Sequence, residues 1–431
     1  MFEPEIETMA RADLARLQLA RLGETLRHAF SRVALFRHRM ELEGLTPDDV
    51  RSLADLRRLP FSTKNDLHDN YPLGLFAVPR EALVRIHASS GTTTGRPTIV
   101  GYTRADLETW AGLMARSLFC AGVRPGDVVH NAYGYGLFTG GIGVHYGAER
   151  LGCTVVPISG GNTARQITML RDLGADVICS TPSYALRIAE LAEQDGVDLR
   201  GAPLRLGVFG AEPWTEAMRI ELETRLGITA VDIYGLSEVM GPGVAIECHQ
   251  ARAGMHGWED HFIFEIIDPQ SGEPLPPGRP GELVITTLTK QALPLIRYRT
   301  RDITRVTLDR CECGRTHLRL AKFAGRTDDM MIIRGVNVYP SQIEEILVGF
   351  AGLAPHYQLQ IGRDGPLDTL TVEVEAAPEA PAESYPQAGA AIAHEIKSRI
   401  GVTCEVQVSA PGAIPRSEGK AVRVRDVRRP H

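Results

Sequence analysis

The sequence lacks long apolar runs, a strong net charge and any abundance of aromatic residues. Over 431 residues the formal net charge is −6, and Phe, Trp and Tyr together make up 6%. No apolar run approaches the ~18 to 20 residues that a bilayer-spanning helix needs. The weak charge gives no attraction to nucleic acid or to an anionic membrane. Because the acidic N-terminal segment also lacks the apolar core of a secretory signal, we expect a cytoplasmic protein.

The cysteines do not form a disulfide framework. There are seven, scattered along the chain, and this usage fits a reducing compartment. The apolar fraction of 43% is ample for a large core. At the rough rule of ~150 residues per domain, the length indicates two or three domains.

The middle of the chain alternates between strand-like and helix-like stretches. Buried strands are predicted at 127–133, 153–159, 176–182, 204–210 and 230–235. Helices are predicted at 163–174, 183–196 and 215–227, with Thr163, Ser183 and Thr215 as N-caps. This alternation predicts an α/β fold with a parallel sheet flanked by helices. An amphipathic helix is expected at 9–30.

The composition changes after residue 255. Segment 261–288 is predicted to form β-strands joined by a Pro/Gly turn, and a smaller α+β unit follows residue 328. Within that unit 330–338, 369–377 and 403–409 are predicted strands, 341–350 and 390–401 are predicted helices, and 377–389 is a predicted loop.

Three separated segments stand in a fixed order. They are SSGTTTGRPT (89–98), DIYGLSE (232–238) and YRTRDI (298–303), the last leading to GRTDDMMIIRG (325–335) and then to PRSEGK ending at Lys420. In this order they resemble the adenylate-forming superfamily of acyl-CoA synthetases, adenylation domains and luciferases. YGYGLFTGG (133–141), FGAEPW (209–214) and RGVNVYPSQIEE (334–345) resemble the phenylacetate–CoA ligase branch. The resemblance runs from about Leu59 to about Val424.

The resemblance implies an ATP site built on the first two segments. Small residues let backbone N–H groups converge on phosphate oxygens, and hydroxyls add donors. The β- and γ-phosphates would be held by Ser89, Ser90, Gly91, Thr92, Thr93, Thr94 and Gly95. The loop has three Thr where close relatives usually have two, and Arg96 where Lys is common. A longer loop leaves the contact of each residue open.

Further nucleotide contacts are implied by the later motifs. Glu238 would hold Mg²⁺, since a hard cation needs carboxylate oxygen. Asp302 would accept from the ribose hydroxyls, with Arg326 at the ribose edge. The adenine and AMP contacts would come from Ala211, Glu212, Pro213, Asp232, Ile233, Tyr234, Gly235 and Ser237.

Catalysis would depend on a mobile small domain. The resemblance divides the chain into an ATP- and acyl-binding domain, 1–327, and a mobile domain, 328–431, that turns about the hinge residue Asp328. Lys420 would reach the α-phosphate and the substrate carboxylate, because a long flexible cation can neutralise charge at the transition state. Gly335 would leave room for the pantetheine of CoA.

An aromatic segment is the candidate acyl pocket. Aromatic rings can stack on an aryl acid, and glycines leave room beside it. The residues are Tyr133, Tyr135, Gly136 and Phe138, with Ile233, Met240 and Pro242 on the other side. Ordinary core aromatics remain the alternative.

Four separated residues form a candidate structural zinc site. Cys311 and Cys313 lie in a Gly/Arg turn, and Cys248 and His256 lie upstream. Three thiolates and one imidazole suit a tetrahedral zinc. Free thiols in a turn are the alternative, because the C-x-C spacing is short.

Together these features predict an ATP-dependent aryl-acid–CoA ligase. It would use ATP, Mg²⁺ and CoA, form an aryl-adenylate and pyrophosphate, and then form an aryl-CoA and AMP. One alternative is an adenylating enzyme that hands the acyl group to a carrier protein or an amine. Another is a non-catalytic binding protein on the same fold. The partners would be a small aromatic acid, ATP and CoA, and the resemblance allows a homodimer.

Overall fold

The computed structural model describes residues 1–89, 97–201, 203–327, 330–334, 336–364, 367–417 and 421–428. In this part of the chain no helix combines the length and the apolar character needed to cross a bilayer. Ser90, Gly91, Thr92, Thr93, Thr94, Gly95, Asp328, Gly335 and Lys420 lie outside the described residues.

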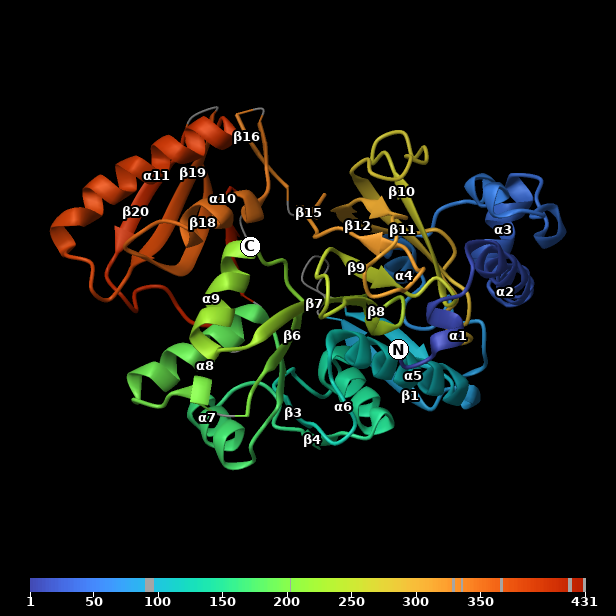
Figure 1. Cartoon of the computed structure of the whole chain (residues 1–431). Helices are drawn as coiled ribbons and strands as arrows, with labels where there is room; N and C mark the ends of the chain where they lie inside the picture. Colours follow the sequence, from blue (N-terminus) through green and yellow to red (C-terminus); the bar gives the residue numbers. More distant parts are fainter. Residues whose placement is uncertain are drawn as a thin grey trace.

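A large sheet organises the N-terminal part of the molecule (Figure 1). In the described residues it has nine strands in the order β13-β14-β9-β8-β7-β6-β5-β3-β4. Neighbours from β4 to β7 are parallel and the remaining pairs are antiparallel. Its strands are β3 (Val128–Asn131), β4 (Thr154–Val156), β5 (Val177–Ser180), β6 (Leu206–Gly210), β7 (Thr229–Leu236), β8 (Gly241–Glu247), β9 (Met255–Gly257), β13 (Val306–Thr307) and β14 (Arg319–Leu320).

The parallel strands are buried on both faces, as a sheet covered by helices requires. Alternate residues enter different cores: Val177 and Cys179 of β5 belong to one hydrophobic cluster and Ile178 to the other.

The helices of the N-terminal part are α1 (Pro4–Glu7), α2 (Arg11–Arg32), α3 (Ala34–Leu42), α4 (Lys64–Asp69), α5 (Arg104–Ala121), α6 (Thr139–Leu151), α7 (Thr163–Asp172), α8 (Pro182–Gln194) and α9 (Glu216–Leu226). The predicted alternation of strands and helices is therefore confirmed.

Two of the predicted helix N-caps are wrong by one or two residues. Thr215 does cap α9 and accepts from the backbone of Met218. Helix α7, however, begins after Asn162, whose side chain accepts from the backbone of Arg165. Helix α8 begins after Thr181 because Pro182 stands at its first position, where a missing N–H costs no helical hydrogen bond.

Smaller sheets complete the N-terminal part. A two-stranded unit pairs β1 (Arg85–Ser89) with β2 (Thr98–Tyr102). A four-stranded sheet has the order β10-β11-β12-β15. The pair β10 and β11 confirms the strands predicted around the Pro/Gly turn. The four strands are β10 (Phe262–Ile267), β11 (Gly281–Thr287), β12 (Tyr298–Thr304) and β15 (Gly325–Arg326).

The C-terminal unit lies beside α9, at the opposite end of the molecule from α2 and α3 (Figure 1). It has a hairpin, a four-stranded sheet of order β20-β19-β18-β21 and two helices. The elements are β16 (Met331–Ile333), β17 (Val336–Val338), α10 (Pro340–Val348), β18 (Leu353–Asp364), β19 (Leu367–Ala376), α11 (Tyr385–Ile400), β20 (Glu405–Ser409) and β21 (Val424–Asp426).

Three details of this unit differ from the sequence prediction. The single strand expected at 330–338 is the antiparallel pair β16 and β17. Strand β18 was not expected, although it pairs with β19 along most of its length. The predicted loop 377–389 contains the start of α11, because Pro386 is tolerated in the first turn of a helix.

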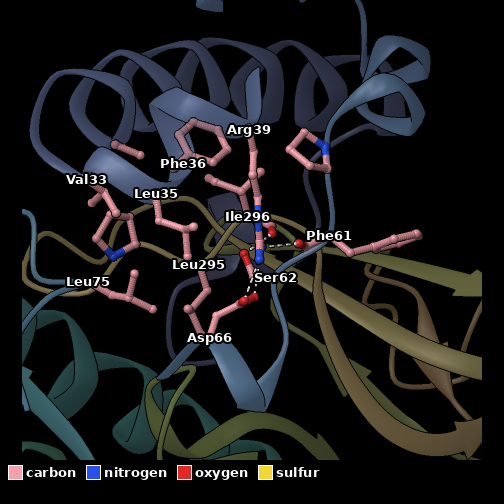
Figure 2. A pocket seen from close by; sticks show the side chains of 13 residues that line it. Val33, Leu35, Phe36, Arg39, Phe61, Ser62, Asp66, Leu75, Leu295 and Ile296 are labelled. Carbon is pink, nitrogen blue, oxygen red and sulfur yellow. Dashed lines mark hydrogen bonds and ion pairs between the residues drawn. The ribbon is translucent and has the colours of Figure 1, made fainter. Parts of the chain in front are cut away.

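A small cavity between α3 and segment 294–296 is separate from all predicted site residues (Figure 2). Arg39 donates to both carboxylate oxygens of Asp66, at 2.9 and 2.5 Å. The cavity volume is about 30 Å³, room for one or two water molecules. It is a packing gap that is too small for an acyl or nucleotide ligand.

Candidate active site

The predicted ligand residues lie at one edge of the large sheet. Because β3, β5, β6 and β7 are parallel, their carboxyl ends meet at the same edge. Each of these four strands is followed directly either by a segment singled out in the sequence analysis or by a segment that packs against one. Crevices outside the carboxyl ends of parallel strands are the usual ligand sites of open α/β sheets.

The structure joins three residues from separate motifs. The hydroxyl of Tyr234 donates to Asp302 Oδ2 at 2.6 Å, and Arg326 Nη1 lies 3.6 Å from Asp302 Oδ1. Asp302 and Arg326 are direct partners across β12 and β15. Burial, then the Asp302 carboxylate, raises the pKa of Tyr234 well above its ordinary value. The predicted adenine and ribose contacts therefore form one connected group.

Phe323 belongs to the same group and was not expected. Its ring stacks on Tyr234 with centroids 4.3 Å apart and planes at 30°. The sequence around it, LRLAKFAG, carries no signal for this role, because the contact depends on a segment 89 residues further along the chain than Tyr234. The Tyr234 and Phe323 rings form a stacked pair beside the Asp302 carboxylate.

The segment after β6 has a strained backbone. Ala211 has φ of 71°, a region that residues with a Cβ seldom adopt and that is common at functional sites. Ala211 and Pro213 are exposed, whereas Glu212 is half-buried. Glu212 Oε1 accepts from the backbone of Ser183 at 2.8 Å. The exposed wall fits the predicted contact with adenine.

Gly235 permits a close backbone approach between β7 and β8. The register shifts between Tyr234 and Gly235, and a Cβ at Gly235 would stand 1.9 Å from the carbonyl oxygen of Gly241. Only glycine avoids that clash. The shift sets the direction in which the following segment, Ser237–Glu238, leaves the strand.

Two buried hydroxyls flank the predicted phosphate loop. Ser89 and Thr98 are direct partners across β1 and β2. Within the part of the chain that the structure describes, neither hydroxyl has a hydrogen-bond partner. Buried polar atoms normally have partners, so these two hydroxyls fit a site that receives a polar ligand.

Glu238 stands in the turn after β7 and is 6% exposed. Among the described residues its carboxylate makes no hydrogen bond or ion pair. Lys290, which follows β11, is 2% exposed and donates from Nζ to the backbone oxygen of Glu238 at 3.4 Å. Burial lowers the pKa of Lys290 to about 8, against the opposing influence of Asp106 and Glu238. Lys290 was not singled out in the sequence analysis, because no motif contains it.

Asp232 lies beneath the edge rather than on it. Its side chain is buried, and its backbone N–H donates to Glu247 Oε2 at 2.9 Å. Burial, then the nearby Glu247 charge, raises the pKa of Asp232. Arg219 pairs with Glu247 at 2.9 Å. This ionic group supports β7 from below, so the described contacts of Asp232 are structural.

The aromatic segment after β3 is divided between core and surface. Tyr133 is buried and its hydroxyl donates to the backbone of Val208 at 3.4 Å, whereas Phe138 is 52% exposed. Tyr135 Oη accepts from Asn131 at 2.7 Å. Of the residues expected opposite, Ile233 and Met240 are buried and Pro242 is half-buried. Gly136 has φ of 86°, which suits glycine.

A side-chain hydrogen bond connects this segment to the second motif. Thr139 Oγ1 lies 2.9 Å from Ser237 Oγ. Thr139 begins α6 directly after Phe138, and Ser237 directly precedes Glu238. The candidate acyl pocket and the candidate magnesium ligand are therefore adjacent in space.

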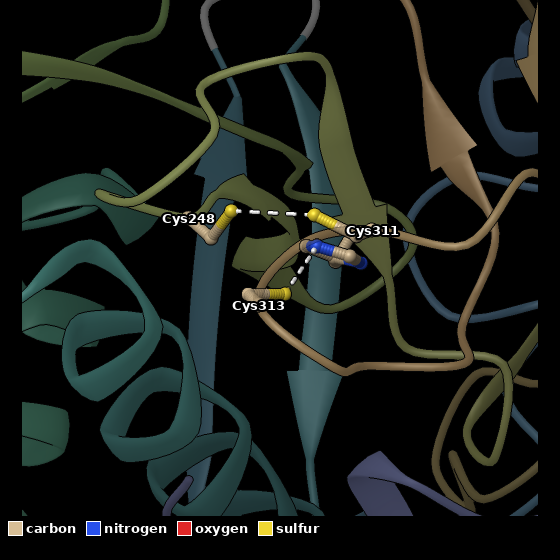
Figure 3. A group of neighbouring side chains, drawn as sticks. Cys248, Cys311 and Cys313 are labelled. Atoms are coloured by element: carbon tan, nitrogen blue, oxygen red, sulfur yellow. Dashed lines mark hydrogen bonds between the residues drawn. The ribbon is translucent and has the colours of Figure 1, made fainter.

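The four predicted zinc ligands are brought together (Figure 3). The donor atoms of Cys248, His256, Cys311 and Cys313 all lie within 4.8 Å of one another. Cys248 Sγ lies 3.7 Å from Cys311 Sγ, and Cys313 Sγ lies 3.3 Å from His256 Nε2. Sulfurs on a tetrahedral zinc at ~2.3 Å would be about 3.8 Å apart, so the donor set fits that ion.

Two histidines that are near these ligands in the sequence have other partners. His249 Nδ1 contacts the backbone oxygen of Cys120, and His317 accepts from the backbone of Glu259. All seven cysteines are free thiols. Cys120 and Cys179 are buried, whereas Cys153 and Cys404 are half-buried.

Family models and individual relatives both match this chain. The family model of the AMP-binding enzyme matches residues 15–289, and that of the AMP-binding enzyme C-terminal domain matches residues 335–428. A phenylacetate-coenzyme A ligase from Aromatoleum evansii is 55% identical over 430 residues, covering 99% of this chain and 97% of the relative. The chain belongs to the phenylacetate-coenzyme A ligase family of AMP-binding enzymes.

Solved structures of a related ligase distinguish two arrangements. The structure of a 2-hydroxyisobutyryl-CoA ligase in the postadenylation state matches with a TM-score of 0.93 and 31% identity, over 99% of this chain and 92% of that one. The same enzyme in the thioesterification state matches with a TM-score of 0.74 and 32% identity, over 98% and 91%. The predicted fold, that of an adenylate-forming enzyme with a large α/β domain and a smaller C-terminal domain, is confirmed.

Proposed function

We propose that this chain ligates a small aryl acid, phenylacetate or a close analogue, to coenzyme A at the expense of ATP. The observation that carries the proposal is the family membership over nearly the whole chain. The group of Tyr234, Asp302 and Arg326 supports it, because it offers a ring and a carboxylate to a nucleoside at the edge of the sheet. Phenylacetate is named from the relatives, and a half-exposed aromatic segment beside Ser237 is consistent with it.

In the first half-reaction a carboxylate oxygen of the acid attacks the α-phosphorus of ATP. The bond from the α-phosphorus to the oxygen bridging the β-phosphate breaks, and pyrophosphate leaves. We assign the phosphates to the loop between Ser89 and Thr98. The buried hydroxyls of these two residues are available as donors. Glu238 would hold Mg²⁺, a role that suits a buried carboxylate without another described partner. Lys420 would neutralise the developing charge.

In the second half-reaction the CoA sulfur attacks the acyl carbon of the adenylate and AMP leaves. We assign the boundary between the two domains to residues 327 and 328, with Asp328 as the hinge. This structure matches the postadenylation state of the related ligase better than its thioesterification state, so its domains are arranged more like those of the postadenylation state. Rotation of the small domain would then open the acyl carbon to the thiol while keeping water out.

We further propose that Cys248, His256, Cys311 and Cys313 hold one structural zinc. Support comes from the donor chemistry and from the distances between the donors. The ion would tie β9 to the turn that follows β13, and it would take no part in the chemistry. A homodimer stays a prediction of the family resemblance, and a cytoplasmic location stays a prediction of the composition and the N-terminal segment.

The decisive experiment is a pyrophosphate-release assay over a panel of aryl acids, with and without CoA. We expect phenylacetate to rank among the preferred acids and an aryl-CoA thioester to accumulate only when CoA is present. The adenylating enzyme that loads a carrier or an amine would instead release pyrophosphate without forming a thioester. No pyrophosphate release with any acid would reject the proposal in favour of a binding protein.

A further inference from the structure

Two carboxylates of the large domain face the C-terminal segment in which Lys420 lies. Glu190 is on α8, and Glu212 follows β6. Figure 1 shows α8 and α9 on the side of the large domain that is turned toward the C-terminal unit. Neither carboxylate was connected to Lys420 by the sequence.

Glu190 contacts two side chains of the small domain, His356 and Arg416. Its Oε1 contacts His356 Nε2, and its Oε2 lies 3.5 Å from Arg416 Nε. The side chains of Glu190 and His356 are each 10% exposed. Burial raises the pKa of Glu190, but the His356 contact and the Arg416 charge outweigh it and the net shift is downward. The carboxylate is therefore held in its charged form at the domain interface.

Arg416 itself is fixed on the small domain. Its two terminal nitrogens donate to the two oxygens of Glu375, both at 2.7 Å. Glu375 is fully buried and also accepts from the backbone of Gly412 and Ile414. Because Arg416 cannot move without this loop, its contact with Glu190 fixes the chain four residues before Lys420.

Glu212 fixes the chain on the other side. Its Oε2 accepts from the backbone N–H of Ala421 at 2.8 Å, and that nitrogen belongs to the peptide bond joining Ala421 to Lys420. The second oxygen of Glu212 accepts from Ser183 in the first turn of α8. Both tethers therefore lead back to one rigid helix of the large domain.

These tethers join the two domains, so a rotation of the small domain against the large one would break them. In the related ligase, the postadenylation and thioesterification structures differ enough that this chain matches one at 0.93 and the other at 0.74. A buried charge that loses its partner is costly, so the interface ion pairs favour the pose in which they are satisfied. Loss of these ion pairs should therefore slow adenylate formation, the step that uses this arrangement of the domains.

We propose that Glu190 and Glu212 are positioning residues for adenylate formation. They hold Arg416 and Ala421, which lie on either side of Lys420 in the sequence, against the large domain, and release them when the small domain turns for thioester formation. This inference rests on the proposed function of Lys420. Because Glu212 also stands in the proposed adenine wall, Glu190 is the residue on which the test is made.

The test measures the two half-reactions separately in Glu190→Gln. Pyrophosphate release should fall about tenfold or more in kcat, since small displacements of a catalytic group are this costly. The KM for ATP should stay near that of the parent. Thioester formation from synthetic phenylacetyl-adenylate and CoA should stay unchanged or become faster. His356→Gln alters the other partner of the Glu190–His356 contact and should likewise slow pyrophosphate release but not thioester formation. This second variant keeps the test possible if Glu190→Gln does not fold.

The matched control is Glu193→Gln. Glu193 is on the same helix, but it pairs with Arg225 of α9 within the large domain, so neither half-reaction should change. Equal losses in both half-reactions of Glu190→Gln, or unchanged pyrophosphate release, would overturn the inference. Lys420→Ala separates the two proposals. If it keeps pyrophosphate release, the role of Lys420 is wrong; if it loses release while Glu190→Gln does not, only the positioning role fails.

Discussion

The hydroxyl of Tyr234 donates to the carboxylate of Asp302 across 2.6 Å, although the two residues are 68 positions apart. Tyr234 lies in β7 of the large sheet, two residues before its end, and Asp302 lies in β12 of the four-stranded sheet. The hydrogen bond leaves Asp302 Oδ1 facing Arg326. A ribose bound here would meet a carboxylate that is already oriented, which lowers the cost of ordering it on binding.

Asp302→Ala should weaken the use of ATP. Loss of hydrogen bonds to a charged acceptor costs roughly 1.5 to 3 kcal/mol each, so the KM for ATP should rise about ten- to a hundred-fold. Tyr234→Phe keeps both the ring on Phe323 and the carboxylate, and should change KM only a few-fold. Pyrophosphate release at varied ATP measures both. An Asp302→Ala enzyme with the parent KM would show that the ribose lies elsewhere.

Protein purified without added zinc should contain about one zinc ion per chain, as one closed four-ligand site requires. Cys311→Ser combined with Cys313→Ser should lose the ion and unfold several degrees earlier, because a metal bound only by the folded state stabilises it. Cys404→Ser changes a half-buried thiol in the other domain and serves as the control. Metal-free protein, or a double variant with the parent Tm, would leave the cluster as free thiols.

Asp328→Pro should slow thioester formation much more than adenylate formation, because proline fixes φ near −65° and obstructs the rotation of the small domain. Single-turnover rates with acid and ATP, and with supplied adenylate and CoA, measure the asymmetry. Asp328→Ala removes the carboxylate but leaves φ free, so it should retain both steps. If the folded proline variant slows both steps equally, or neither, the hinge is at another residue.

The sequence predicted those features that local patterns encode. From residue 127 to 238 the five predicted strands and the three predicted helices were found, because runs of buried residues and turn residues encode them, whereas helix α6 between β3 and β4 was not predicted. The zinc-type cluster was predicted from donor chemistry alone. Its residues are distant in the sequence: Cys248 and Cys311 are 63 positions apart, yet their sulfurs lie 3.7 Å apart. The boundaries were less exact, because Asn162 and Thr181 compete with nearby Thr163 and Ser183 as caps.

Contacts between distant segments could not be predicted. Glu190 and His356 are 166 positions apart, and nothing near either residue indicates that a domain interface joins them. Phe323 reads as an ordinary core residue, although it stacks on Tyr234. Strand β18 was missed for a different reason. Tyr357, Leu359 and Ile361 are buried and alternate with the two glutamines between them, a period-2 pattern that is typical of a half-buried strand.

Lys290→Met should stabilise the fold near neutral pH. The ordinary lysine pKa of 10.5 falls to about 8 in the folded chain because the ammonium is buried. Below pH 8 the folded state therefore bears a cost of the order of 3 kcal/mol, at 1.36 kcal/mol for each pKa unit. Between pH 8 and 10.5 the unfolded chain binds the proton and the folded chain does not, so this cost fades as pH rises.

The measurement is the difference in urea unfolding midpoint between Lys290→Met and the parent at several pH values. We expect the variant to be more stable at pH 7 and its advantage to shrink steadily from pH 8 to pH 10. Lys397→Met, which removes an exposed lysine of α11, should give a difference that does not depend on pH. A Lys290→Met advantage that stays constant across this range would show that the buried ammonium is not what costs stability. A variant less stable than the parent at every pH would show instead that the contacts of Lys290 with Tyr102 and with the backbone of Glu238 outweigh its burial.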